Sequence, residues 1–520
     1  MKLKRGLISV FIVLTMLVSV LYSGTQVKEQ EKQNIFDNTK TVHIWYADEA
    51  LTDHLSSMAV KFNEEYGVRV IPVLQSGLEF LEKINEASLT TKTVPDLYIA
   101  SNDIMEKAYL TGLATEISNP DSVVSLENFP ESAIYAVTYQ QKLLGYPLYY
   151  ETSALLYNMT YLESMAQEQI EEEMGVEVGS METMDKTNPS EHDETISDNS
   201  TVSEHDETIS DNSTVSEHDE SADNDGITYI PQEEMNALIH EKLPSLIPRT
   251  FDALLDFAEH YDAPENVEAV FKWDVADIFY NYFFVGNYID VGGMSGDSTH
   301  SIDIYNLDAI KALKVYQDLS QYFAIEADDV AYDSVIQDFM EGKIVMTTAT
   351  TDVVRKLEEA KESGEFVYDY GIATIPNLNA EMETKGLSVT STIYVNGYSK
   401  LREEANKFAS YLVDEHAPDL YTGAGKVPAN KNVVYDNPNL DMFMDEYQDS
   451  VPMPKMMATS NFWVKMEIIF DRIWNGSEVS RELKGLSEQI MTQVKGMPYE
   501  ETYIEMPQET EEYFEYSDDE

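Results

Sequence analysis

Apolar positions change their spacing in a regular order from residue 41 onward. Val42 to Tyr46 forms a short apolar run that is typical of a strand. Leu51 to Tyr66 carries apolar residues at the spacing of an amphipathic helix, and Val68 to Val73 returns to a strand pattern. The order predicts a strand, a helix and a second strand, which together make a βαβ unit.

The alternation continues through a predicted helix at Gly77 to Ala87, a strand at Asp96 to Ala100 and a helix at Asp103 to Thr111. Such alternation predicts an α/β fold, with helices on both faces of a mostly parallel sheet. In open sheets of this kind the ligand crevice lies at the carboxyl ends of the strands. We therefore expect a site near Tyr46 to Glu49 and near Ala100 to Asp103.

The amino terminus departs from this pattern. Met1 to Arg5 is basic, and an apolar run follows from Leu7 to Tyr22, which is the arrangement of an export signal. A helix over 6–27 would also approach the roughly 20 residues that cross a bilayer. Residues 1–27 are thus predicted to be either a cleaved signal peptide or a retained membrane anchor. The chain is expected in the periplasm or on the extracellular face of the cell membrane.

The middle of the chain contains an internal repeat. Ser190 opens a stretch of thirteen residues that recurs from Ser203 and, truncated, from Ser216. A period this short is below that of solenoid units, and the repeat has too few apolar residues to offset the entropy of ordering. We predict a disordered acidic insert at 165–226. The carboxyl terminus, 499–520, is acidic and lacks a helical period, which indicates a loose acidic tail.

The repeat places His192, His205 and His218 each beside Glu and Asp, and both residue types are ligands of divalent metals. The alternative of a metal site is weak, because the thirteen-residue spacing puts no two of these histidines on one helical face. We therefore predict no metal site, and no motif in the sequence indicates a cofactor.

Composition narrows the class of protein. A chain of 520 residues with 43% hydrophobic content can bury the cores of two or more domains. Its 95 acidic and 34 basic residues give a net charge of -61, which argues against a nucleic-acid partner. The excess indicates a solvated acidic surface, with salt adaptation as the alternative. The chain has no cysteine, so neither disulfides nor a lipid-bearing thioether are expected.

Six segments from residue 44 to residue 463 carry a family resemblance through their order and spacing. They are Ile44–Glu49, Val94–Ile99 with Leu110–Ile117, Lys142–Glu151 with Ala154–Asn158, Asp338–Met346, Gly425–Asn430 and Met453–Trp463. Together they resemble bacterial extracellular solute-binding proteins of the maltose-binding type. The family's passage from a Tyr-Asn pair to a Thr-Phe-Asp helix start is also present, at Tyr157 and Thr250, separated here by the acidic insert.

The resemblance implies two α/β lobes that close on a ligand about hinges, a motion common to periplasmic binding proteins. The hinges would be the chain crossings near 149–153 and 376–386. The implied lobes are 40–149 plus 386–433 for lobe one and 154–380 plus 434–498 for lobe two.

Sugars present flat C–H faces and rims of hydroxyl groups, so a sugar site needs aromatic rings together with carboxylates or amides. Alternatives remain for several residues: Trp463 and Trp273 as core aromatics, Tyr150 as hinge packing, and Asp103 as a helix-terminal acid. The resemblance implies these ligand-binding residues: Glu49, Asp103, Tyr150, Glu151, Trp273 and Trp463.

Two positions depart from the maltose-binding pattern. Ala100 and Asp352 stand where the family has stacking tryptophans. The loss of two rings from a long sugar face indicates a shorter or different saccharide. The remaining tryptophans, Trp45 and Trp474, lie within a strand and a helical pattern and are predicted to be core residues.

The implied function is capture of a carbohydrate, as a monomer, and its delivery to the permease subunits of an ABC importer. A ligand-presenting receptor for a membrane sensor, or a binding protein for a non-sugar solute, is the alternative. An enzyme such as a two-carboxylate glycosidase is not predicted, because no nucleophile elbow, zinc motif or phosphate loop occurs in the sequence.

Overall fold

The computed structural model describes residues 40–90, 94–178 and 228–506. The predicted export segment 1–27, the three repeat histidines and the predicted insert from residue 179 onward lie outside these ranges. Within the described ranges, no helix has both the length and the apolar character that spanning a membrane requires.

A nine-stranded mixed sheet forms the centre of the molecule, in the order β2-β1-β3-β14-β6-β12-β9, with β13 beside β6 and β15 beside β14. Three two-stranded sheets pair β4 with β5, β7 with β8 and β10 with β11. The strands are β1 (Thr41–Tyr46), β2 (Arg69–Leu74), β3 (Leu97–Ser101), β4 (Thr138–Tyr139), β5 (Lys142–Leu143), β6 (Gly145–Asn158), β7 (Val176–Val178), β8 (Thr228–Ile230), β9 (Ala269–Phe271), β10 (Asp290–Val291), β11 (Ile302–Asp303), β12 (Ile344–Thr350), β13 (Tyr370–Ala373), β14 (Leu387–Val395) and β15 (Val451–Pro452).

The predicted βαβ unit is confirmed, since β1 pairs in parallel with both β2 and β3. The expectation of a mostly parallel sheet is wrong. The two central strands, β6 and β14, run antiparallel to each other, and each is antiparallel to a further neighbour. Helical crossovers make strands parallel only where they connect neighbours, and these central strands come from distant parts of the sequence.

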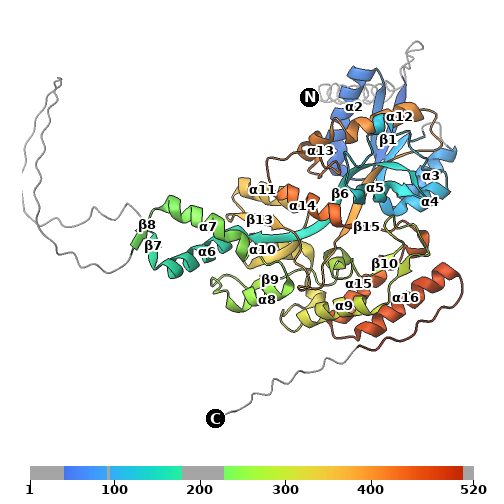
Figure 1. Ribbon diagram of the computed structural model, residues 1–520. Coiled ribbons are helices and arrows are strands. Elements are labelled where there is room, and N and C mark those ends of the chain that lie inside the picture. Colours follow the sequence, from blue (N-terminus) through green and yellow to red (C-terminus); the bar gives the residue numbers. More distant parts are fainter. Residues whose placement is uncertain (1–39, 91–93, 179–227, 507–520) are drawn as a thin grey trace, which may run out of the picture.

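Helices cover the sheet in two groups (Figure 1). The α-helices are α2 (Thr52–Tyr66), α3 (Phe80–Thr90), α4 (Met105–Leu110), α5 (Glu131–Val137), α6 (Met159–Met174), α7 (Gln232–Leu246), α8 (Phe251–His260), α9 (Leu307–Leu319), α10 (Tyr332–Met340), α11 (Val353–Ser363), α12 (Arg402–Val413), α13 (Ala417–Ala424), α14 (Asn439–Asp449), α15 (Phe462–Trp474) and α16 (Val479–Lys495). The 3-10 helices are η1 (Glu49–Leu51), η2 (Asn102–Ile104), η3 (Pro120–Ser122), η4 (Ile278–Tyr280), η5 (Tyr282–Phe284), η6 (Ala327–Asp329) and η7 (Met457–Thr459).

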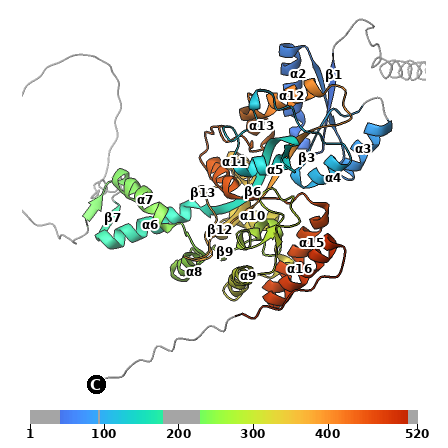
Figure 2. The ribbon, with the colours of Figure 1, turned by 45° about the vertical axis from the view of Figure 1, so that its right-hand side comes forward.

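Two large apolar cores lie along the sheet. The first joins β1, β3 and β14 to helices α2, α12 and α13, and it extends to α10, α11 and α14. The second joins β9 and β12 to helices α8, α9, α15 and α16. Strand β6 contributes to both, with Tyr149 in the first core and Leu155 in the second. This long strand therefore connects the two halves of the molecule (Figures 1 and 2).

Helices α6 and α7 form an arm that projects from the rest of the molecule (Figure 2). A small core of its own lies between them, and β7 pairs in parallel with β8 at its tip. The sequence predicted a disordered insert that begins at residue 165. This prediction is wrong for residues 165–178, which belong to α6, the turn after it and β7. Ala166 and Ile170 are buried against α7, because their four-residue spacing places both on one helical face.

The predicted loose tail is also partly ordered. Residues 499–506 form no helix or strand, yet the backbone N–H and carbonyl of Ile504 are both hydrogen-bonded. Its carbonyl accepts a hydrogen bond from the Ser480 hydroxyl at 2.8 Å, and its N–H donates to the Tyr305 hydroxyl at 2.7 Å. The acidic composition of this segment gave no sign of these contacts.

Candidate functional site

Strand β6 positions the first group of polar residues where it passes between the two cores. Its residues Tyr149 to Thr152 pair with β14, and Ser153 pairs with Thr350 of β12. The backbone of this crossing is thus hydrogen-bonded on both sides, which holds its side chains in fixed directions. Glu151, one of the predicted ligand-binding residues, lies in this crossing and is about half exposed.

Four side chains converge at the crossing, and we call Asp48, Tyr149, Glu151 and Lys426 the Lys426 cluster. The Lys426 ammonium lies 3.0 Å from Asp48 Oδ2 and 3.5 Å from Glu151 Oε1. The Tyr149 hydroxyl donates to Asp48 Oδ2 at 3.1 Å, and the Lys426 ammonium lies 5.2 Å from the centre of the Tyr149 ring. Three separate segments of the chain therefore meet here.

Local structure explains how the two ion-pair partners from other segments reach the crossing. Asp48 follows β1 and caps η1, where its Oδ1 accepts a hydrogen bond from the Ala50 N–H at 3.0 Å. Lys426 follows Gly425, which ends α13 in the left-handed conformation with φ of 68°. That reversal turns the chain away from the helix axis and toward β6.

Within the Lys426 cluster, the surroundings of Asp48 and Lys426 favour the ionised state of each. Burial raises the pKa of Asp48, but the ion pair with Lys426 and the hydrogen bonds from Ala50 and Tyr149 outweigh it and lower the pKa overall. Burial likewise lowers the pKa of Lys426, and the neighbouring Tyr149, Glu151 and Asp48 raise it above its usual value. The site thus presents fixed acceptors and a fixed donor, which is what sugar hydroxyls require.

The second group of residues lies at the start of α15. Trp463 is half buried there, and its ring lies 6.0 Å from that of Tyr282 and 5.2 Å from that of Phe462. One turn further on, burial raises the pKa of Glu467, and the nearby acids Asp277 and Asp274 add to this effect. The Trp463 ring therefore lies on the same helix as Glu467, which has two further acids, Asp274 and Asp277, nearby.

The two groups are connected through the crossing strand. The Ser153 hydroxyl, two residues after Glu151, donates to the Phe279 carbonyl of η4 at 3.4 Å. Helix η4 packs against α15, which carries Trp463. In the described part of the chain, no hydrogen bond, ion pair or ring contact joins the Lys426 cluster directly to Trp463.

The remaining predicted acids flank the crossing at the ends of β1 and β3. Glu49 is exposed at the start of η1, directly after Asp48 of the Lys426 cluster. Asp103 is half buried in the first turn of η2, where it accepts a hydrogen bond from the Ser101 hydroxyl. Both loops are the ones expected from the carboxyl ends of the strands, as the sheet rule predicted.

The structure excludes Tyr150 from the exposed surface, which corrects the prediction that it contacts the ligand. Tyr150 has no exposed surface and stacks on Tyr447 with ring centres 3.9 Å apart. Side chains alternate between the two faces of a strand, so Tyr149 and Glu151 share one face and Tyr150 faces the other. The alternative of hinge packing describes its position.

Trp273 is a second correction. It has no exposed surface, its indole N–H donates to Asn281 Oδ1 at 2.8 Å, and its ring lies 5.3 Å from that of Trp474. Alternation again decides its position, because Phe271 and Trp273 point inward while Lys272 and Asp274 do not. Trp273 is therefore a core residue of the second half of the molecule.

The sequence analysis missed Asp48 and Lys426. Both lie in segments that carry the family resemblance, Ile44–Glu49 and Gly425–Asn430. Asp48 and Lys426 are 378 positions apart in the chain, and no sequence-spacing rule connects residues at that separation. A signal was present for Asp48, since it follows the first strand directly. For Lys426 the only sequence signal was the helix-ending glycine before it.

Comparison with known proteins supports the resemblance. A family model described as bacterial extracellular solute-binding protein matches residues 195–454. A maltodextrin-binding protein of Bacillus subtilis is 25% identical over 211 residues, covering 38% of this chain and 49% of that protein. A maltotriose-binding protein of Pyrococcus abyssi is 22% identical over 282 residues, covering 51% of this chain and 59% of that protein. The chain thus spans only about half of the length of these relatives.

Solved structures share the fold over nearly the whole chain. An extracellular solute-binding protein of Staphylococcus aureus in complex with maltose superposes with a TM-score of 0.63 at 18% identity, covering 88% of this chain and 98% of that one. The maltose-binding protein MalE of Listeria monocytogenes, also with maltose, gives a TM-score of 0.58 at 18% identity, covering 89% of this chain and 100% of that one. The likeness establishes the two-lobe α/β fold that the sequence predicted.

Proposed function

Because the chain belongs to the bacterial extracellular solute-binding proteins, we propose that it captures a carbohydrate between its two lobes and delivers it to the permease subunits of an ABC importer. The observation that carries the proposal is the Lys426 cluster on the strand between the lobes. It offers two carboxylates, a phenol and an ammonium. The ammonium lies within 3.5 Å of both carboxylates, and the phenol donates to one of them at 3.1 Å. Such a set of donors and acceptors suits hydroxyl groups.

The proposed site combines this cluster with Trp463 and with the flanking acids Glu49 and Asp103. The Trp463 ring would stack on the C–H face of a sugar, and the carboxylates would accept hydrogen bonds from its hydroxyls. The relatives named above bind maltodextrin, maltotriose or maltose, which supports a carbohydrate ligand. Ala100 and Asp352 supply no ring, so we propose a shorter saccharide than a long maltodextrin.

We propose that the lobes have the boundaries inferred from the sequence, 40–149 plus 386–433 and 154–380 plus 434–498. The crossings at β6 and β14 support this division, because both strands run through the centre of the sheet. The protein would act outside the cell as a monomer, without a cofactor and without catalysing a reaction. The family assignment supports its export.

Calorimetry with glucose, maltose, maltotriose and maltotetraose tests the proposal. We expect at least one sugar to bind, and we expect Glu151→Gln to weaken it about tenfold, since hydrogen bonds to charged groups contribute about 1.5–3 kcal/mol. Trp463→Ala should weaken the same sugar and remove most of the change in tryptophan fluorescence. Of the other three tryptophans, Trp273 and Trp474 lie in the core and Trp45 packs against the first core.

Glu403→Gln is the matched control, because Glu403 is exposed on α12. It should leave sugar affinity unchanged. Heat of binding with a peptide, a polyamine or a metal ion, and none with any sugar, would overturn the ligand class. A sugar affinity that Glu151→Gln and Trp463→Ala both leave unchanged would overturn the site.

A further inference from the structure

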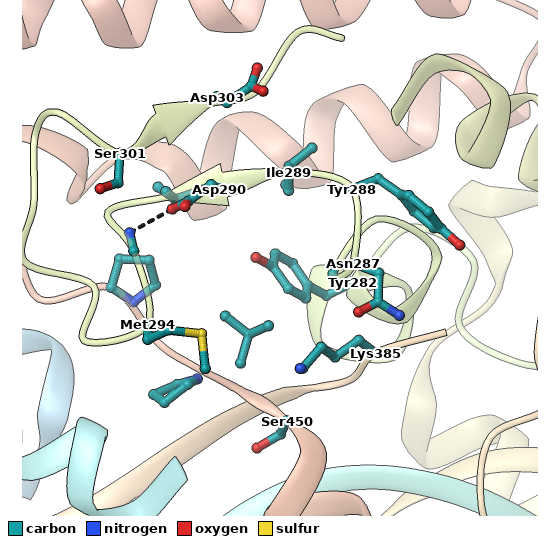
Figure 3. A pocket seen from close by; sticks show the side chains of 16 residues that line it. Tyr282, Asn287, Tyr288, Ile289, Asp290, Met294, Ser301, Asp303, Lys385 and Ser450 are labelled. Carbon is teal, nitrogen blue, oxygen red and sulfur yellow. Dashed lines mark hydrogen bonds between the residues drawn. The ribbon is translucent and has the colours of Figure 1, made fainter. Parts of the chain in front are cut away.

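A cavity of about 670 Å³ lies apart from the site described above (Figure 3). Its walls come from η5 and the loop that leads into β10, from the chain around Lys385 before β14, and from Ser450 to Pro454 around β15. None of the six predicted ligand-binding residues lines it. Its volume lies within the roughly 300–1,000 Å³ that is typical of small-molecule sites.

Tyr282 gives this cavity an unused hydrogen-bonding group. Its side chain is only 1% exposed, and its hydroxyl points into the cavity (Figure 3). That hydroxyl makes no hydrogen bond with any residue in the described part of the chain. Burial, followed by the charge of Asp290, raises the pKa of Tyr282, so the hydroxyl stays protonated and able to donate. A hydroxyl that faces a cavity and has no protein partner is open to a hydrogen bond with a ligand or with water.

The charged groups that line the cavity are of both signs: one lysine, Lys385, and two acids, Asp290 and Asp303. The Lys385 ammonium points inward in Figure 3, and its ion-pair partner in the described part, Asp449, lies 3.5 Å away and is largely exposed. Asp290 faces the same space, and its Oδ1 accepts hydrogen bonds from the Gly292 and Gly293 N–H groups at 2.9 and 2.5 Å. Groups of both signs in one cavity favour a ligand without a net charge, which can hydrogen-bond to the ammonium and to the carboxylates.

A neutral ligand with several hydroxyl groups can form hydrogen bonds with Tyr282, Lys385 and Asp290 at once. Hydroxyls accept hydrogen bonds from the ammonium and the phenol, and they donate to the carboxylate. The apolar side chains of Met294, Val451 and Pro452 line the same cavity and offer contact to C–H surfaces. This mixture of donors, acceptors and apolar surface is what sugars require.

We propose that this cavity is a second carbohydrate site, which binds a small neutral saccharide independently of the site between the lobes. Tyr282 donates to a sugar hydroxyl, Lys385 donates to another, and Asp290 accepts from a third. The ring of Tyr282 lies 6.0 Å from that of Trp463, so one wall residue of the cavity packs beside the aromatic ring of the first site.

A single-cysteine reporter tests the proposal, because the chain has no cysteine of its own. Met294 lines the cavity and is 59% exposed, so Met294→Cys in the full chain can carry an environment-sensitive fluorophore. The titrations use glucose and maltose in a background with both Glu151→Gln and Trp463→Ala, the two changes expected to weaken the first site. We expect a saturable change in fluorescence, and we expect Tyr282→Phe and Lys385→Met each to raise the half-saturating concentration at least about fivefold.

Tyr98→Phe is the matched control, because it removes a buried hydroxyl that has no partner in the described residues but lies outside the cavity. It should leave the half-saturating concentration unchanged. Absence of a saturable response to either sugar overturns the proposal, and so does a response that Tyr282→Phe and Lys385→Met leave unaltered. Circular dichroism shows whether Tyr282→Phe folds. If it does not, the half-saturating concentration of Lys385→Met alone tests the proposal.

The reporter also separates this proposal from the function proposed for the first site. A response at Met294→Cys, together with heat of binding that Glu151→Gln and Trp463→Ala both leave unchanged, would support the second site and contradict the first. Heat of binding that Glu151→Gln weakens, without a response at Met294→Cys, would do the opposite.

Discussion

On strand β6, Tyr149 and Glu151 belong to the Lys426 cluster, whereas Tyr150 between them stacks on Tyr447. The pleat of a strand reverses the direction of each successive side chain, so neighbours in the sequence have different environments. Glu446, on the adjacent helix α14, shows the same effect of position. It is only 9% exposed, although the acids on either side of it on the same helix, Asp445 and Asp449, are exposed.

Glu446 predicts a dependence of stability on pH. Burial raises its pKa to about 7, and the Ile375 N–H, which donates to its carboxylate, only partly counteracts this. The folded state therefore retains a proton that the unfolded chain releases near its ordinary pKa. The stability from this group is fully present below about pH 4.5 and is lost as the pH rises through about 7.

We therefore expect Glu446→Gln to raise the free energy of unfolding by about 1–3 kcal/mol at pH 8 and by much less at pH 5. The glutamine carbonyl can still accept from Ile375. Urea unfolding at both pH values measures the difference, with the exposed Glu403→Gln as the control. An equal effect of Glu446→Gln at both pH values would contradict this explanation.

At the scale of elements, the arm formed by α6 and α7 is distinct from the rest of the molecule because it has an apolar core of its own. Its small core consists of five residues from three segments: Ala166, Ile170, Ile230, Met235 and Ile239. Strands β7 and β8 pair residue by residue from Val176 with Thr228 onward, so the two ends of the insert are held together. An insertion whose ends meet leaves the lobe that carries it undisturbed.

Weakening this arm should thus have a local effect. We expect Met235→Ala to cost about 2–5 kcal/mol within the arm, because Met235 is fully buried there. Hydrogen exchange should increase in α6 and α7, while sugar binding and exchange in β6 and β14 stay unchanged. Gln232→Ala, at an exposed position of α7, is the control. Faster exchange throughout the sheet after Met235→Ala would show that the arm supports the whole fold.

At the scale of the whole molecule, two cores meet across strands β6 and β14. Helix α14, which the sequence assigned to lobe two, contributes Phe443 and Tyr447 to the first core. The lobe boundaries and the hinge crossings stay predictions, while the central sheet shows β6 paired with β14 on one side and with β12 on the other. Domain closure would then be a rotation about strands whose backbones are paired on both sides.

Closure predicts a shorter distance across the cleft when ligand binds. Nitroxide labels at Asp53→Cys and Asp352→Cys, both exposed and neither part of the proposed site, mark helix α2 and the loop after β12. We expect pulsed electron resonance to show a shorter distance in maltotriose than in buffer. A control pair at Asp53→Cys and Glu65→Cys, both on α2, should keep its distance. Equal distances for the first pair in both conditions would contradict closure on this sugar.

The sequence by itself determined the α/β class, the first βαβ unit and the family, because these depend on local periodicity and on the order of motifs. It also placed Glu49 and Asp103 near strand ends, since the sheet rule needs only the strands. Only the tertiary structure brought Asp48 and Lys426 together, and it moved Tyr150 and Trp273 into the interior. The face that a strand residue presents depends on which neighbours pair with it, and those neighbours lie hundreds of positions away in the chain.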